Sequence, residues 1–286
     1  MVFESELFVQ YIRMHQLDKA LAYKNQFIPG TLFKFFPLFE EYDNDTKAEI
    51  PDHIFKNSKR FTNLLDEKIW LSKYKTFNDP YEFKSTYYDN PSLLIPKAKI
   101  ERAEEIIENT RNKYFISCFS DYVYENIPMW AYYSYNHQGY CLRFKVKNRD
   151  DFYRVSYVNQ KAALTEKMLD ELIYGYIDPN LKTAYKLNNT LIHLSFCTKF
   201  IRWQSEKEIR LIFEINAEES LGMPVHYSVF GLQIQDIFIG YKCSYEHFNR
   251  LLEIGKILNC NVYRMSPNEK SKYFRMEKDI VYKSKI

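Results

Sequence analysis

The stretch Tyr140–Val146, with the sequence YCLRFKV, decides the fold class because its side chains alternate in character. Its apolar members share one face of an extended chain, while Cys141, Arg143 and Lys145 share the other. This period of two predicts a strand with one face in a core. Other strand-like runs lie on both sides of it, and helical patterns separate them in groups.

The same reasoning predicts the other elements along the chain. Strands are expected over residues 32–36, 69–71, 114–119, 206–215, 234–239 and 261–265, with 154–158 as the hairpin partner of Tyr140–Val146. Helices are expected over 4–24, 63–67, 97–112, 127–135, 160–174, 180–198 and 245–258, and a loop with at most one helical turn over 42–59. Grouped strands favour an α+β fold with a mainly antiparallel, mixed central sheet flanked by helices and one late β-α-β unit.

The chain length and the absence of any linker-like segment predict one compact domain over residues 1–286. The sequence has no internal repeat, no low-complexity stretch and no linker rich in Pro or Ser. We divide it into an N-terminal helical extension (1–30), a core (32–243), and a C-terminal helix and strand (244–286). The basic end, residues 270–285, is expected to be solvated.

Glycine is scarce, and its spacing excludes two classes of nucleotide site. The chain has 7 glycines, and no two of them lie within eight positions of each other. A dinucleotide fingerprint or a P-loop needs closely spaced glycines. Neither motif occurs in this sequence, which disfavours Rossmann-type hydride transfer and P-loop phosphate chemistry. A net charge of +3, with dispersed basic residues, leaves nucleic-acid binding open without requiring it.

The cysteine spacing and the hydropathy of the chain bear on metal binding and on the cellular compartment. The 5 cysteines are widely spaced and form no C-x-x-C pair, and the 6 histidines show no metal-ligand spacing, so no metal site is predicted. No stretch approaches 18 apolar residues, and residues 1–10 lack the pattern of a signal peptide. We expect a cytoplasmic protein that does not enter a membrane.

Asn78, Asp79 and Pro80 follow a predicted strand and are typical of a turn, because the residue before proline avoids the helical region. One interpretation is a stiff turn that caps itself. The other is that Asp79 and Glu82 point into a cleft at the end of the strand.

Trp130, Tyr133 and His137 lie on or just after a short aromatic helix. They either pack in a core or form an aromatic wall beside which His137 acts as acid, base or hydrogen-bond donor. Cys118 and His137 could also form a nucleophilic pair, although no local signature supports one.

Glu206, Glu208 and Arg210 share one face if residues 206–215 form a strand, and Lys199 and Trp203 precede them. On an open sheet face they would be an ion-pair ladder that contributes little to stability. In a cleft they would form a polar wall able to bind a sugar hydroxyl and stabilise a developing cation.

These segments together resemble a bacterial family known as domain of unknown function 2971. The matching residues are Leu32-Phe33-Lys34-Phe35, Trp70-Leu71-Ser72, Phe77-Asn78-Asp79-Pro80-Tyr81-Glu82, Ile116-Ser117-Cys118-Phe119-Ser120, Met129, Trp130, Tyr133, His137, Gly139, Cys141, Phe144, Lys199, Trp203, Glu206, Glu208 and Arg210. They extend over residues 32–243. The first strand departs from the family, since Phe36 stands where members tend to carry arginine.

The order of features is also similar, more distantly, to ADP-ribosyltransferases. That resemblance implies a first strand with Lys34, a serine strand with Ser117 and Ser120 (or Ser72), and the Glu206–Glu208 pair. It also implies NAD as a substrate, with no cofactor required by the structure. Glu208 would be the electrostatic catalyst, Glu206 would orient it, and His137 would belong to the catalytic set. The substrate-binding residues would be Lys34, Ser72, Asn78, Asp79, Glu82, Ser117, Ser120, Trp130, Tyr133, Lys199, Trp203 and Arg210.

We therefore expect an intracellular, defence-associated bacterial effector with ADP-ribosyltransferase-like or glycohydrolase-like activity toward a nucleotide-like ligand. Two alternatives stay open. One is a metal-dependent nuclease or hydrolase using Asp79, Glu82, Glu206 and Glu208. The other is a non-enzymatic sensor that binds a nucleotide or a host or phage macromolecule. Whether the protein is an enzyme at all is open at this stage.

Overall fold

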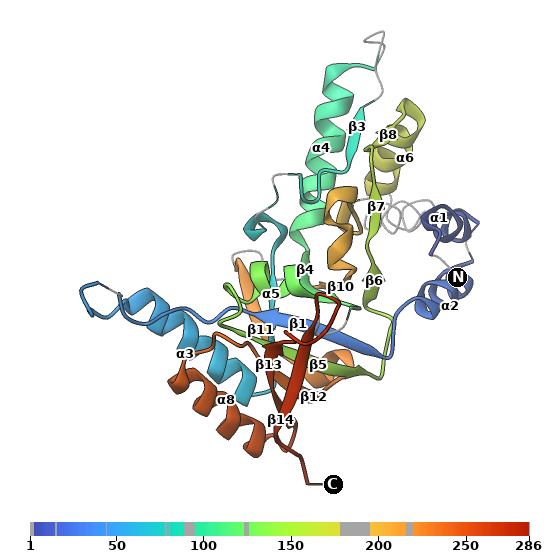
Figure 1. Ribbon diagram of the computed structural model, residues 1–286. Helices are drawn as coiled ribbons and strands as arrows, with labels where there is room; N and C mark the ends of the chain where they lie inside the picture. Colours follow the sequence, from blue (N-terminus) through green and yellow to red (C-terminus); the bar gives the residue numbers. More distant parts are fainter. Residues whose placement is uncertain are drawn as a thin grey trace.

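A mixed, mostly antiparallel sheet with helices packed around it forms the frame of the molecule (Figure 1). The computed structural model describes residues 3–14, 16–43, 45–77, 79, 81–88, 95–122, 126–177, 195–215 and 220–285. The predicted α+β class and mainly antiparallel sheet are confirmed.

The helices are α1 (Ser5–Arg13), α2 (Leu17–Gln26), α3 (Pro51–Leu65), α4 (Lys97–Asn112), α5 (Ile127–Tyr133), α6 (Glu166–Ile177) and α8 (Tyr245–Ile257). Short 3-10 turns are η1 (Tyr74–Thr76), η2 (Ile201–Glu206) and η3 (Tyr227–Phe230).

The strands are β1 (Thr31–Phe36), β2 (Lys68–Ser72), β3 (Thr86–Tyr88), β4 (Tyr114–Ser120), β5 (Tyr140–Val146), β6 (Phe152–Arg154), β7 (Ser156–Val158), β8 (Ala162–Leu164), β9 (Thr198–Phe200), β10 (Glu208–Glu214), β11 (Gly222–His226), β12 (Leu232–Ile239), β13 (Asn261–Pro267) and β14 (Met276–Tyr282). Within the described residues the main sheet runs β11-β2-β4-β1-β5-β12-β13-β14, and β10 joins β4 to β6.

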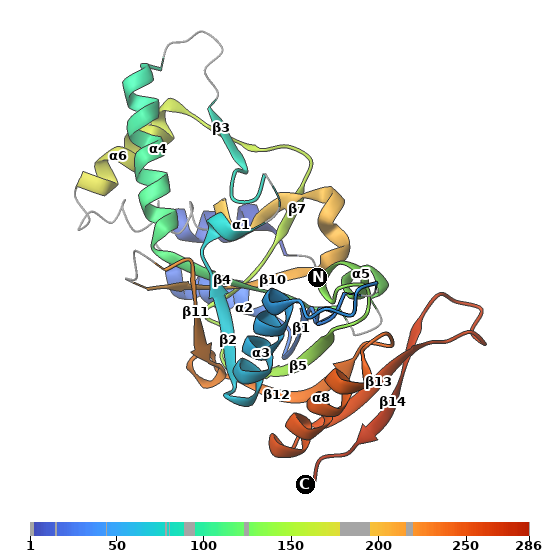
Figure 2. The ribbon, with the colours of Figure 1, turned by 90° about the vertical axis from the view of Figure 1, so that its left-hand side faces the viewer.

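β5 lies in the middle of this sheet and pairs antiparallel with β1 and with β12. Its predicted alternation is confirmed, because its even-numbered side chains are buried in the main core. α3 and α8 cover that face of the sheet (Figure 2). β12 and β13 are parallel neighbours joined through α8, which confirms the predicted late β-α-β unit.

β1 separates two cores because its side chains alternate between them. Leu32 belongs to the main core under α3 and α8. Phe33 and Phe35 belong to a second cluster with Trp130 of α5, where the rings of Phe35 and Trp130 meet edge to face at 5.1 Å. Lys34 therefore lies on the same side of the strand as Leu32, and this direction places it in the cavity described below.

Several predicted boundaries are wrong. The helix expected over 4–24 is two helices, α1 and α2, which pack against each other and bury Phe8, Ile12 and Ala20 between them. The loop expected over 42–59 contains most of α3, whose first residue, Pro51, suits a helix start because its fixed φ is already helical and a first-turn N–H needs no partner. β14 lies within the end that was expected only to be solvated.

The predicted pairing of residues 154–158 with β5 is also wrong, because β6 pairs with β10 and β7 pairs in parallel with β9. Tertiary pairing decided this, since β1 and β12 already occupy both edges of β5. The helix expected over 160–174 begins later, after β8. Residues 178–194, most of the helix expected over 180–198, lie outside the described residues.

Candidate functional site

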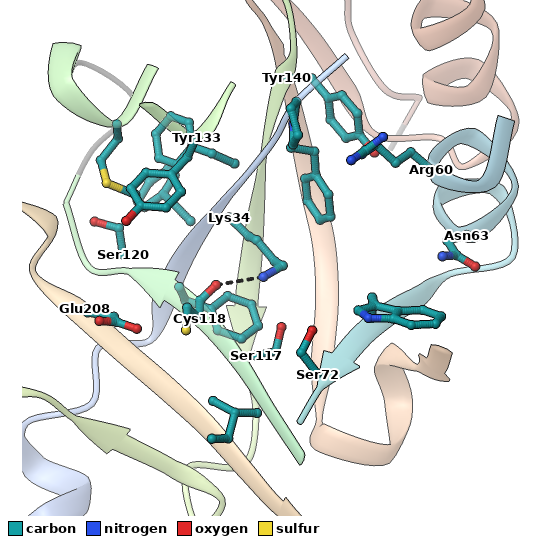
Figure 3. A pocket seen from close by; sticks show the side chains of 18 of the residues that line it. Lys34, Arg60, Asn63, Ser72, Ser117, Cys118, Ser120, Tyr133, Tyr140 and Glu208 are labelled. Atoms are coloured by element: carbon teal, nitrogen blue, oxygen red, sulfur yellow. Dashed lines mark hydrogen bonds between the residues drawn. The ribbon is translucent and has the colours of Figure 1, made fainter. Parts of the chain in front are cut away.

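A cavity of about 630 Å³ opens between α3 and β2 on one side and the strands β1 and β4 on the other (Figure 3). Its walls are mostly aromatic and aliphatic, with charged groups at two places. One is a cluster of carboxylates and cations near β10, and the other is a group of cations and hydroxyls near β1 and α3. Largely apolar cavities with a few convergent polar groups are typical of small-molecule sites.

The carboxylates Glu82, Glu206 and Glu208 converge on Lys199, and all four line the cavity. Lys199 Nζ lies 2.7 Å from Glu206 Oε2, 3.4 Å from Glu208 Oε2 and 3.5 Å from Glu82 Oε2. Arg210, fully buried behind them, donates from Nε to Glu208 Oε1 at 2.9 Å and also pairs with Glu82. The exposed ion-pair ladder that the sequence left open is therefore excluded.

A turn rather than a strand aims Glu206 and Glu208 at Lys199. Glu206 ends η2, Lys207 adopts the left-handed conformation with φ 44°, and β10 begins at Glu208. The strand predicted from residue 206 thus begins two residues too early. Ser120 Oγ donates to the Glu206 carbonyl at 2.7 Å, which fixes the turn against β4.

The two glutamates differ in their electrostatic environment. Burial raises the pKa of Glu206, and the nearby charge of Lys199 opposes this only in part. Burial also acts to raise the pKa of Glu208, but Arg210 and Lys199 outweigh it and lower that pKa to about 2. Glu208 is thus held ionised, whereas Glu206 takes up a proton more readily. Tyr133 Oη donates a hydrogen bond to Glu206 Oε1 and completes this end of the cavity.

Lys34, Ser72 and Ser117 line the middle of the cavity, where Figure 3 shows their polar ends pointing toward the same space. Lys34 Nζ donates to the Cys118 carbonyl at 2.9 Å, and burial lowers the pKa of this lysine. Of the predicted site residues, the structure brings nine to one cavity: Lys34, Ser72, Glu82, Ser117, Ser120, Tyr133, Lys199, Glu206 and Glu208.

Apart from Ser72, the wall formed by α3 and β2 was not among the predicted site residues. It contributes Phe55, Lys59, Arg60, Asn63 and Trp70 among other residues. Residues 42–59, which include the first part of α3, had been interpreted as a polar loop. The recurrence of large and basic side chains four residues apart, after a proline suited to a helix start, is the signal that could have revealed a helix with one face toward a ligand.

His137 and Trp130 do not line this cavity. The His137 ring stacks on the buried Trp130 at 6.4 Å and meets Tyr241 at 5.0 Å, and burial lowers its pKa. The turn is packed tightly, since a Cβ on Gly240 would lie 2.1 Å from the His137 carbonyl oxygen. The structure thus brings neither residue to the charged cluster.

Three other predicted residues lie beside the cavity rather than on it. Asp79 caps its own turn, accepting from the Tyr81 amide at 2.9 Å, which agrees with the self-capped interpretation. Trp203 packs under Lys199, whose Nζ lies 4.9 Å from the ring centre. Arg210 does not line the cavity but forms ion pairs with Glu82 and Glu208, which do. Asn78, also predicted, lies outside the described residues.

Cys118 lines the cavity without His137 nearby, and burial raises the pKa of its thiol well above the ordinary value. The nucleophilic pair is therefore not formed. Among the described residues no group of three or more His, Cys, Asp or Glu side chains could hold a metal ion. Lys199 and Arg210 contact the carboxylate oxygens that a metal would need.

The profile of a family described as "Protein of unknown function (DUF2971)" matches residues 129–211. This segment of the chain is similar to the DUF2971 family. It runs from α5 into β10, so it contains Tyr133, Lys199, Glu206, Glu208 and Arg210. The polar cluster, apart from Glu82, is thus a feature of the DUF2971 segment.

No curated protein and no solved structure matches the chain. Of the described residues, no helix is long and apolar enough to cross a membrane.

Proposed function

We propose that this protein binds a nucleotide-like ligand in the cavity and cleaves or transfers it at a glycosidic carbon, with NAD as the first candidate substrate. A cytoplasmic, defence-associated bacterial effector is the biological setting that we propose with it, on the strength of the family resemblance. The observation that carries the chemistry is the pair Glu206 and Glu208, which line one cavity and have pKa values shifted in opposite directions.

Cleavage of a glycosidic bond builds positive charge on the sugar ring. With all groups ionised, the carboxylates of Glu82, Glu206 and Glu208 exceed the cations of Lys199 and Arg210 by one negative charge. In a water-poor cavity this excess stabilises an oxocarbenium-like transition state. Nicotinamide departs as a neutral molecule and needs no acid, so the proton to be removed comes from the attacking water or acceptor hydroxyl.

Glu206 is suited to take that proton, because burial raises the pKa of its carboxylate. Tyr133 holds one of its oxygens, and Lys199 holds the other. Glu208 stays ionised, bound to Arg210 on the side away from the cavity opening, and supplies charge rather than proton transfer. The balanced reaction is NAD⁺ and water giving nicotinamide, ADP-ribose and a proton.

The test is incubation of the purified protein with NAD, followed by chromatographic measurement of nicotinamide. We expect release by the wild-type protein and at least a ~100-fold slower release by Glu208→Gln, in line with the loss of one preorganised electrostatic contact. Glu214→Gln, an exposed change on the same strand, is the matched control and should retain the rate.

Tyr133→Phe provides a second variant in case Glu208→Gln does not fold. It removes one hydrogen bond to Glu206 and should slow release while circular dichroism stays native. Absence of nicotinamide release by folded wild-type protein, or a wild-type rate in folded Glu208→Gln, would contradict the proposal. Tight binding of NAD without turnover would favour the sensor alternative.

A further inference from the structure

The side of the cavity opposite the carboxylates holds polar groups that no part of the described chain satisfies. Ser117 Oγ and Arg60 Nη1 are buried, and neither has a hydrogen-bond partner among the described residues. The described part of the chain offers Lys34 Nζ one acceptor, the Cys118 carbonyl, although an ammonium carries three donors. Buried polar groups in native proteins nearly always have partners, so a cavity with several such groups calls for a ligand that supplies acceptors.

The positive charge on this side of the cavity indicates an anionic ligand. α3 and β2 contribute Lys56, Lys59, Arg60 and Lys68 to the cavity, and neither element contributes an acidic residue to it. The rings of Phe36 and Tyr140 stack at 4.9 Å, and the Lys34 ammonium lies 5.7 Å from the centre of the Phe36 ring. Figure 3 shows the Arg60 guanidinium directed toward Tyr140, across the cavity from Glu208. Lys34 and Arg60 line the same cavity, and two cations facing one space suit a ligand with two linked anionic groups.

The mouth of the cavity offers a flat ring surface next to these cations. Trp70 is 40% exposed although it lines the cavity, and its indole packs on Gly222, where a Cβ would lie 2.5 Å from Trp70 Nε1. The ring is therefore held against the backbone of β11 rather than free to turn. Lys59 lies on the same side, 5.8 Å from the Trp70 ring. A fixed, half-exposed aromatic ring beside positive charge is the arrangement on which nucleobases stack.

We propose that the α3–β2 side of the cavity is a nucleoside-diphosphate subsite, in which Lys34, Arg60 and Ser117 bind the phosphates and Trp70 stacks on the base. The inference deepens the proposed function, on which it rests for the role of the carboxylate end, by naming the substrate class as one that carries a diphosphate. Glycine-rich loops are absent from this sequence, so side chains from α3, β1 and β4 supply the donors that backbone amides supply in such loops.

The experiment compares the binding of ADP and of adenosine by isothermal titration calorimetry. Adenosine carries the same base and sugar without phosphates. We expect ADP to bind wild-type protein at least ~10-fold more tightly than adenosine does. Lys34→Met and Arg60→Gln should each raise the Kd of ADP by at least ~10-fold and leave that of adenosine within about twofold, since each change removes one charge-assisted contact.

Lys145→Met on β5 and Arg102→Gln on α4 are the matched controls, because they change the same residue types at exposed positions. Both should bind ADP like the wild type. Gly222→Ala should weaken adenosine and ADP alike, because it displaces Trp70.

Equal binding of ADP and adenosine, no binding of ADP, or unchanged ADP binding in both Lys34→Met and Arg60→Gln would overturn the subsite. A general loss of affinity for both ligands in these folded variants would also overturn it. Failure of the proposed reaction leaves a different signature. In that case ADP binds as expected while NAD is not cleaved.

Discussion

At the scale of single residues, the site depends on alternation along β10. Glu208 and Arg210 point to the cavity side of the strand, and Ile209 and Leu211 point into the main core. Both sides of the strand are buried, so the polar side must pair internally. Arg210 meets this need through bonds to Glu82, Glu208 and the Phe196 carbonyl.

The ion pairs of Glu208 predict a loss of stability in acid. Its pKa in the folded protein is about 2, below the ordinary value of 4.5, so the unfolded chain binds more protons between these values. This contribution is complete above pH 4.5 and is lost as the pH falls toward 2. We expect the free energy of unfolding of the wild type, relative to Glu208→Gln, to fall by on the order of 2 kcal/mol between pH 5 and pH 3.

Urea unfolding at pH 5, 4 and 3 checks this expectation. For Glu214→Gln, on the exposed end of the same strand, the free energy of unfolding should change with pH as it does in the wild type. If the free energies of unfolding of Glu208→Gln and the wild type changed equally with pH, the ion pairs would not lower the pKa of Glu208.

At the scale of elements, one lysine ties the N-terminal helices to the sheet. Lys24 of α2 is buried, and its Nζ donates to the carbonyls of Arg149, Asp150 and Phe152 at 3.0, 2.8 and 2.8 Å. A helix as short as α2 is marginal by itself, so its place depends on such tertiary contacts. The tie also holds the segment that leads into β6, and β6 pairs with β10 of the site.

Replacing this lysine should therefore loosen the N-terminal helices. We expect Lys24→Met to lower the free energy of unfolding by on the order of 3 kcal/mol, because one buried and two partly buried carbonyls lose a charged donor. Lys19→Met, an exposed change on the same helix, should have little effect. Denaturant unfolding measures the free energy of unfolding of both variants. Equal values would argue that the hydrogen bonds of Lys24 do not hold the N-terminal helices on the sheet.

At the scale of the whole molecule, one part projects from the main body. α4 and α6, with the small β3–β8 sheet, form a lobe beside the large sheet (Figures 1 and 2). Its buried residues make a cluster of their own, separate from the main core. A small separate cluster opens at lower free energy than a large central one.

Hydrogen exchange should show this difference. We expect the amides of β1, β5 and β12 to exchange slowest, near the limit of global unfolding, and those of α6 to exchange at least ~10-fold faster by local opening. Mass spectrometry of exchanged peptides gives both rates. Equal protection in the two regions would mean that the lobe and the sheet unfold together.

The sequence by itself determined the alternation of β5, the late β-α-β unit, and most residues of the polar cluster. These features are set by local rules, because strand period, turn residues and the pairing of opposite charges can be read within a short window. It could not determine that β6 pairs with β10, because several strands could have accepted it and only the completed sheet left that edge free.

Tertiary structure alone decided which side chains meet in the cavity. Arg60 and Trp70 are separated from Glu208 by more than a hundred residues, and no local pattern links them. They line one cavity because α3 packs against β2, β2 pairs with β4, and β4 pairs with β10. The pairing of β10 with β4 and the contacts with Glu82 and Lys199 bury Glu208 and Arg210 together, which converts a possible surface ion pair into a charged site at an apolar cavity.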